Sequence, residues 1–118
     1  MSTPYILVLV TTKDFEEAET IAKELLKQKL IACANIVNPV VSHFHWSGTI
    51  NRSEECIVIM KSRGDLFPKI SQQVKALHSY EVPEIIALPI MIGSSDYLAW
   101  IDESLKWILY IFVQISLK

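Results

Sequence analysis

The chain has 118 residues, with 11 basic and 13 acidic side chains, a formal net charge of −2 and only three glycines. This length suits a single domain that buries a core without disulfides or metals. The basic side chains are scattered, which excludes the positive patch of a nucleic-acid-binding protein, and two distant cysteines exclude a zinc finger or a disulfide framework.

The first predicted element is a strand over Tyr5–Thr12, which is apolar at both odd and even positions. This pattern is typical of a strand that is buried on both faces. The run is too short for a signal peptide or a membrane span, and no basic region precedes it. We therefore expect a protein of the reducing cytoplasm without a membrane-spanning segment.

A helix is predicted from Asp14 to about Lys29, where the hydrophobic period changes. Asp14 and Glu17 resemble a capping box, in which the first side chain bonds the amide three residues later. The apolar residues that recur at helical spacing are Ala18, Ile21, Ala22, Leu25 and Leu26.

A β-hairpin is predicted after this helix. Its first strand spans Ala32–Trp46 and contains Pro39, its turn spans Ser47–Ser53, and its second strand spans Glu54–Lys61.

The second half begins with a helix that opens at Gly64-Asp65 and carries one apolar stripe, made of Leu66, Ile70, Val74 and Leu77. A strand over Glu84–Ile92, a helix that starts near Asp96 and an apolar tail complete the chain.

The order βαββαβ with an added C-terminal helix is the signature of an α+β, ferredoxin-like fold with an antiparallel sheet. We expect one such domain over residues 1–106, with residues 107–118 as its apolar tail. Right-handed crossovers place the first and third strands in the centre of the sheet. Pro39 and Pro89 then fall in edge strands, where a missing N–H is tolerated.

The two central strands are apolar on both sides, yet two helices can cover only one face of the sheet. The other face would leave an exposed apolar patch larger than a monomer usually carries. We therefore expect other subunits to cover it.

Four motifs resemble the CutA family of divalent-cation tolerance proteins. They are Ile31–Ile36, Trp46-Ser47-Gly48, His78–Pro89 and Asp96–Trp100, and the resemblance as a whole covers roughly Tyr5 to Lys106. The resemblance implies a homotrimer in which long hairpins wrap around neighbouring subunits. It also implies a non-catalytic role in divalent-metal tolerance, with weak binding of Cu²⁺ or another divalent metal and no organic cofactor.

A candidate metal site lies between the second helix and the last strand. His78, Glu81 and Glu84 combine imidazole and carboxylate ligands, which suit copper and zinc. The resemblance adds Cys33 as a soft ligand. The alternative interpretation is structural: His78 caps the helix C-terminus, Glu81 pairs with a lysine, and Cys33 fills core volume.

Aromatic residues near turns and helix starts form a candidate ligand pocket between subunits. The aromatic members are Trp46, Tyr80, Tyr97 and Trp100, and the polar members are Lys61, Glu84 and Asp96. The alternative is that these aromatic side chains simply pack at an interface.

His43 and His45 lie two residues apart on a predicted strand and hence on one face, where they could hold a metal together. This pair departs from the CutA pattern, so such a site would be peculiar to this chain. Solvated histidines on an edge strand are the interpretation that we favour from the sequence.

Catalysis finds little support, since no serine elbow, glycine-rich phosphate loop or Cys/His pair is present. Two other functions stay open. One is a sensor that resembles PII-type signal proteins and binds a small ligand between subunits. The other is a scaffold whose surface or tail, Trp107–Lys118, anchors a partner protein.

Overall fold

The computed structural model describes residues 4–106, and the predicted tail lies outside them. The elements follow the predicted order, with one added turn of 3₁₀ helix, η1. They are β1 (Tyr5–Thr12), α1 (Phe15–Lys27), β2 (Cys33–Trp46), β3 (Thr49–Arg63), η1 (Gly64–Leu66), α2 (Phe67–Leu77), β4 (Ile85–Pro89) and α3 (Ser95–Ser104). None of the helices in this range is long and apolar enough to cross a membrane.

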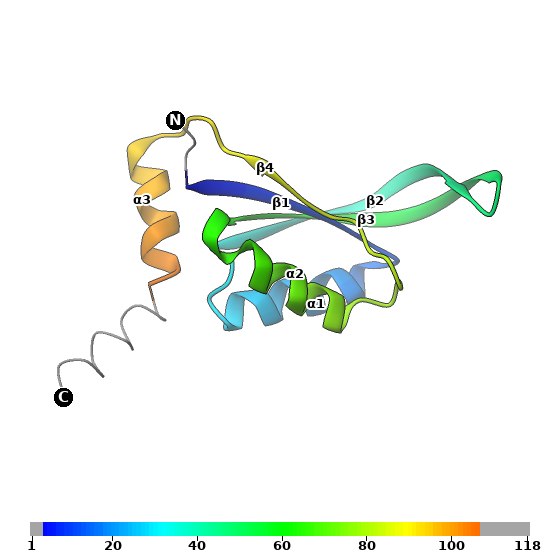
Figure 1. Ribbon diagram of the computed structural model, residues 1–118, viewed down its shortest axis with the longest axis horizontal. Coiled ribbons are helices and arrows are strands. Elements are labelled where there is room, and N and C mark those ends of the chain that lie inside the picture. Colours follow the sequence, from blue (N-terminus) through cyan, green and yellow to red (C-terminus); the bar gives the residue numbers. More distant parts are fainter. Residues whose placement is uncertain (1–3, 107–118) are drawn as a thin grey trace.

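The sheet has the strand order β2-β3-β1-β4, and every pair of neighbours is antiparallel. The prediction that β1 and β3 are central is confirmed. Pro39 lies in β2 and Pro89 ends β4, so both prolines are in edge strands as expected. Helices α1 and α2 lie side by side on one face of this sheet (Figure 1).

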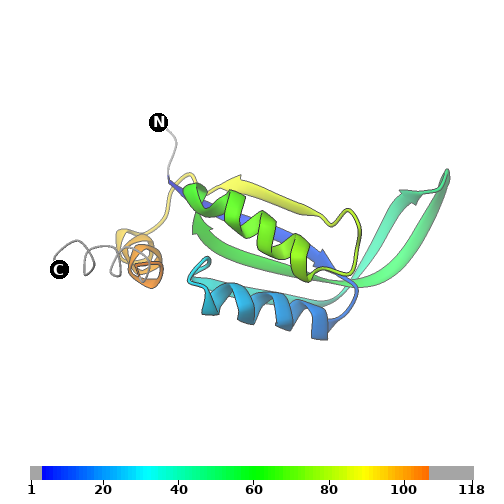
Figure 2. The ribbon, with the colours of Figure 1, turned by 60° about the horizontal axis from the view of Figure 1, so that its bottom comes forward.

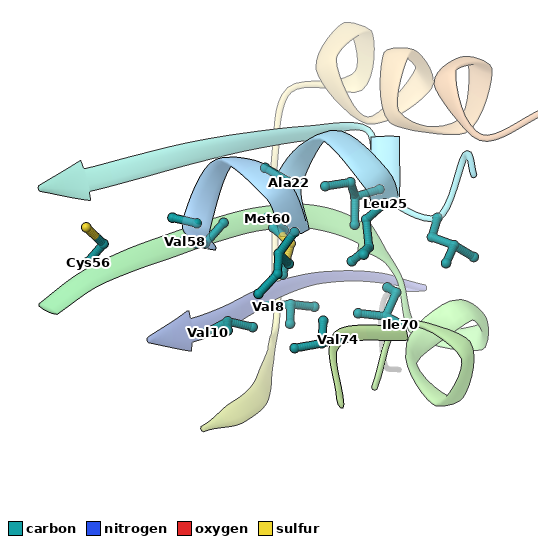
Figure 3. Packing of buried hydrophobic residues seen from close by; sticks show 13 residues of the cluster. Val8, Val10, Ala22, Leu25, Cys56, Val58, Met60, Ile70 and Val74 are labelled. Atoms are coloured by element: carbon teal, nitrogen blue, oxygen red, sulfur yellow. The ribbon is translucent and has the colours of Figure 1, made fainter. Parts of the chain in front are cut away.

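The hydrophobic core lies between that face and the two helices. Alternate residues of the central strands point into it, and the helices contribute the stripes that their 3.6-residue period predicts. Figure 3 shows this packing, whose fully buried members include Val8, Val10, Val58, Met60, Leu25, Ile70 and Val74. Each buried side chain of this size stabilises the fold by about 1.5–3 kcal/mol.

Helix α1 begins at a side-chain cap, as the sequence predicts. The Asp14 carboxylate accepts a hydrogen bond of 2.8 Å from the Glu17 amide. The returning bond differs from a regular capping box, because Glu17 accepts from the Lys13 amide at 3.1 Å. The helix ends at Lys27, two residues earlier than expected, and Lys29 takes a left-handed φ of 59°.

The hairpin of β2 and β3 is longer than predicted, and the predicted turn over residues 47–53 is wrong. Only Ser47 and Gly48 form the turn, with φ angles of 51° and 77° that suit a two-residue hairpin connection. The polar residues after it belong to β3, because this part of the hairpin is solvent-exposed on both sides. Figures 1 and 2 show the hairpin reaching far beyond the helices.

A bulge interrupts the pairing of this hairpin. Val37 pairs with Ile57 and Val40 with Glu55, so two residues of β2 stand opposite Cys56 alone. The segment of β2 and β3 beyond this bulge is called the arm below; it comprises residues 40–55.

Helix α3 lies at the end of the sheet opposite the arm (Figure 1). Ser94 caps its first turn, so the helix starts one residue before Asp96. Asp102 connects the helix to the sheet. It accepts a hydrogen bond of 2.6 Å from the Tyr5 hydroxyl and forms an ion pair of 2.5 Å with Arg63.

The face of the sheet opposite α1 and α2 is apolar, as expected, and no helix covers its centre (Figure 1). We call it the open face. The register places its residues side by side on all four strands: Val37, Ile57, Ile59, Leu7, Leu9, Ile86 and Leu88. Ile86 and Leu88 are 49% and 45% exposed, although water-facing strand positions are ordinarily polar.

Candidate functional site

His78 stands at the C-terminal cap of α2, and its side chain is fully buried. The backbone amide of Tyr80 donates a hydrogen bond of 3.0 Å to Nδ1. This nitrogen therefore carries no proton, so Nε2 carries it and donates to the Thr11 carbonyl at 2.7 Å. Both ring nitrogens of the neutral imidazole are engaged within the chain.

Glu17 joins α1 to the loop that follows His78. Its side chain is 8% exposed, and it accepts hydrogen bonds from the amides of Lys13 and Ser79 at 3.1 and 2.8 Å. Its Oε1 lies 3.9 Å from Nδ1 of His78. Burial would raise the pKa of Glu17, but the hydrogen bonds from Ser79 and Lys13 outweigh it and lower this pKa below its ordinary value.

Tyr80 completes this cluster. Its hydroxyl donates a hydrogen bond of 2.7 Å to Glu55, and its ring lies 4.8 Å from that of His78. Burial, and then the neighbouring Glu55 carboxylate, raise the pKa of Tyr80 strongly. The phenol therefore stays protonated. Within this cluster Tyr80 and Glu55 bond each other, whereas the side chains of His78 and Glu17 bond backbone groups.

The four predicted metal ligands do not converge within one chain. Glu81 and Glu84 are exposed, and Cys33 lies on the open face beside Lys61, which pairs with Leu7. His78 contacts Thr11, four residues further along β1, which is roughly 13 Å of strand. In residues 4–106, no group of three or more His, Cys, Asp or Glu side chains could hold a metal ion.

Part of the predicted ligand pocket does come together, at the α3 end of the open face. The Cys33 thiol lies 3.7 Å from the Tyr97 hydroxyl, and the Tyr97 and Trp100 rings are 5.5 Å apart. The hydrogen bond with Cys33 raises the pKa of Tyr97, and burial adds to this effect. Lys61 is the cross-strand neighbour of Cys33 and donates a hydrogen bond to Asn35.

The other predicted members of this pocket lie elsewhere. Asp96 is exposed one residue before Tyr97, Trp46 stands next to the hairpin turn and is 68% exposed, and Tyr80 belongs to the His78 cluster. A single chain therefore brings together only Lys61, Tyr97 and Trp100 of the predicted pocket, and they lie beside Cys33 of the predicted metal set.

Two surface cavities flank the start of α1, at a place that the sequence did not indicate. One, of about 240 Å³, is lined by Lys13, Asp14, Glu16, Glu17, Thr20 and Leu77. The other, of about 250 Å³, is lined by Lys13, Asp14, Phe15, Asn38, Pro39, Glu54, Glu55 and Cys56. The sequence also missed Glu55 and Thr11 as partners of Tyr80 and His78, because these pairings depend on the strand register.

Comparisons with known proteins agree with the fold and the motifs. The family model described as CutA1 divalent ion tolerance protein matches residues 6–104. A relative from Thermus thermophilus, named divalent-cation tolerance protein CutA, is 44% identical over 98 residues, which are 83% of this chain and 95% of that protein. A solved structure of CutA from Archaeoglobus fulgidus superposes with a TM-score of 0.83 at 44% identity and covers 86% of this chain and 98% of its own.

The names of the relatives correct one expectation, which is the cytoplasmic location. The Archaeoglobus protein is described as periplasmic, and a relative from Arabidopsis thaliana, 39% identical over 87% of this chain and 57% of its own length, is named as chloroplastic. The expectation rested on a short apolar N-terminal run and on the cysteine count, and neither feature determines a compartment. The family itself is not in question: with nearly the whole described domain matched at this level, the chain belongs to the CutA1 divalent ion tolerance protein family.

Proposed function

We propose that this protein binds divalent cations as a homotrimer and contributes to metal tolerance without catalysing a reaction, with copper as the leading ion. The observation that carries the proposal is the match of residues 6–104 to a family whose members are named for divalent-cation tolerance. Imidazole, thiol and carboxylate groups, which suit copper and zinc, are all present at the surface of the chain.

The open face supports assembly. Its aliphatic side chains form one continuous surface across four strands, and Val37, Ile86 and Leu88 are each more than 40% exposed in the single chain. A monomer rarely leaves such a surface in water, so contact with further copies of the chain accounts for it. The long arm gives each copy a way to reach its neighbours.

The His78 cluster supports a role without catalysis. A general base needs a free nitrogen or oxygen near a substrate, whereas His78 and Glu17 bond the backbone and the Tyr80 hydroxyl bonds Glu55. If His78 binds a metal together with Glu81, Glu84 and Cys33, it must first give up one of its two hydrogen bonds. That set remains a proposal for the assembled protein.

A second candidate is a small-ligand sensor, favoured by the group of Cys33, Lys61, Tyr97 and Trp100. These residues offer a cation, a hydroxyl and two neighbouring aromatic rings, tilted by 36° to each other, at the margin of the open face. A ligand that binds there raises the melting temperature with its occupancy. A flat thermal-shift response to nucleotides, organic acids and amino acids would count against the sensor.

The proposed function is tested by calorimetric titration of the intact chain with Cu²⁺ and Zn²⁺, with its mass measured by light scattering. We expect a mass three times that of the chain and a dissociation constant tighter than about 1 mM, which corresponds to roughly −4 kcal/mol. A monomer at micromolar concentration refutes the assembly, and the lack of detectable binding refutes the metal role.

A further inference from the structure

His43 and His45 lie in the arm, on the same side of β2. Both are exposed, and among residues 4–106 no hydrogen bond or ion pair engages either ring. The chain contains only three histidines, and both nitrogens of the third, His78, are already used. The imidazoles that are free to take a ligand are therefore these two.

Strand geometry sets the spacing of the pair. Residues two apart on a strand have Cα atoms roughly 6.8 Å apart and point to the same side. Metal–imidazole bonds of about 2.0–2.1 Å require the two ligating nitrogens to come within about 3 Å of each other. Two histidine side chains can reach this distance when their torsion angles turn the rings toward each other. The backbone is held in place, since His43 pairs with Arg52 and His45 with Ile50.

The neighbours on this side of the ladder carry opposite charges. Arg52 stands directly opposite His43 and disfavours a cation there. Glu54, which pairs with Val41, is diagonal to His43 on the same side and offsets part of that charge. The surroundings thus permit a cation, and the Arg52 side chain limits its affinity.

The bulge at residues 38 and 39 separates this pair from the open face. Before the bulge, the odd-numbered Val37 lies on the open face opposite Ile57; after it, the even-numbered Val40 lies on that face opposite Glu55. The odd-numbered residues that follow, His43 and His45 among them, therefore lie on the other side of the sheet, which is the side of Cys56. A subunit that covers the open face therefore approaches the side of the sheet opposite to the histidines.

We propose that His43 and His45 together bind one borderline divalent cation, such as Cu²⁺ or Zn²⁺, at an exposed site on the arm. Imidazole nitrogen suits these ions and not Mg²⁺ or Ca²⁺, which prefer oxygen ligands. The remaining coordination positions are open to water or to a group from another molecule. This inference rests on the proposed function and assigns it a site distinct from His78.

The test is calorimetric titration of the full chain with Cu²⁺ and with Zn²⁺, together with electron paramagnetic resonance of the Cu²⁺ form. His43→Gln and His45→Gln remove one imidazole each while keeping a polar side chain. We expect each to weaken binding by at least ten-fold and the double variant to abolish the two-nitrogen spectral signature. Ser42→Ala, on the other side of β2, is the matched control and leaves binding unchanged.

A gain of affinity provides the second readout, because misfolding does not produce one. Arg52→Gln removes the facing positive charge, so we expect Cu²⁺ to bind about two- to five-fold more tightly at low salt. Equal binding by the wild type and the double variant overturns this inference and leaves the proposed function standing. Lack of binding by the wild type overturns both.

Discussion

The two hydrogen bonds of His78 within the chain predict that its side chain stabilises the fold, and a single substitution tests this prediction. His78→Ala removes the acceptor for the Tyr80 amide and the donor for the Thr11 carbonyl. Each part-buried group left without a partner costs about 1–2 kcal/mol, so the free energy of unfolding should fall by about 2–4 kcal/mol. This loss should be the same with or without metal, since it arises from bonds within the chain.

The assay is urea unfolding, followed by circular dichroism at one protein concentration and in the presence of a chelator. With an m value of about 2 kcal/mol/M, the midpoint should fall by roughly 1–2 M. His78→Gln is the control, because its amide offers both a donor and an acceptor and should lose less than half as much. If His78→Ala changes stability only when Cu²⁺ or Zn²⁺ is added, the residue is a metal ligand and the reasoning is wrong.

Three further predictions concern other parts of the molecule. The pKa of Glu17 is lowered in the fold, so the stability that this group contributes is present above its ordinary value of 4.5 and is lost as the pH falls through the folded pKa. Glu17→Gln should therefore reduce the loss of stability that acid causes below pH 4.5, and an unchanged acid-unfolding curve would contradict this. Ile59→Lys, at the centre of the open face, should shift the mass in light scattering to that of one chain, whereas Lys75→Glu on the exposed side of α2 should not. Gly48→Ala meets no neighbour within 4 Å but keeps φ at 77°, so it should cost about 1 kcal/mol in thermal or urea unfolding, and a neutral effect would show that the turn relaxes.

The sequence was sufficient to predict the order of helices and strands and the order of strands in the sheet. The hydrophobic period indicates the type of each element, and the two prolines independently restrict their strands to the edges of the sheet. It failed at the hairpin turn, where Asn51, Arg52 and Ser53 are polar because both sides of the arm meet solvent. Polar composition is typical of turns and of exposed strands alike, so only the positive φ angles of Ser47 and Gly48 separate the two.

The candidate site was predictable only in part. The cap formed by Asp14 and Glu17 was visible because it is local, whereas the bond from Tyr80 to Glu55 joins residues 25 apart. Several titratable residues close together in the sequence, as around His78, are typical of a binding site and equally typical of side chains that hydrogen-bond within the fold. What distinguishes the two is whether the polar atoms are already used, and that depends on the register of distant strands.

The bulge in β2 also determines the direction in which the arm leaves the sheet. From Val40 to Trp46 the arm extends roughly 20 Å beyond it, so a change of about 20° in strand direction at this point moves the hairpin turn by about 7 Å. A substitution beside Asn38 or Pro39 that leaves the core intact can therefore relocate Trp46 and both arm histidines as one rigid unit. The direction of the arm thus depends on two residues of β2 that lie outside the hydrophobic core.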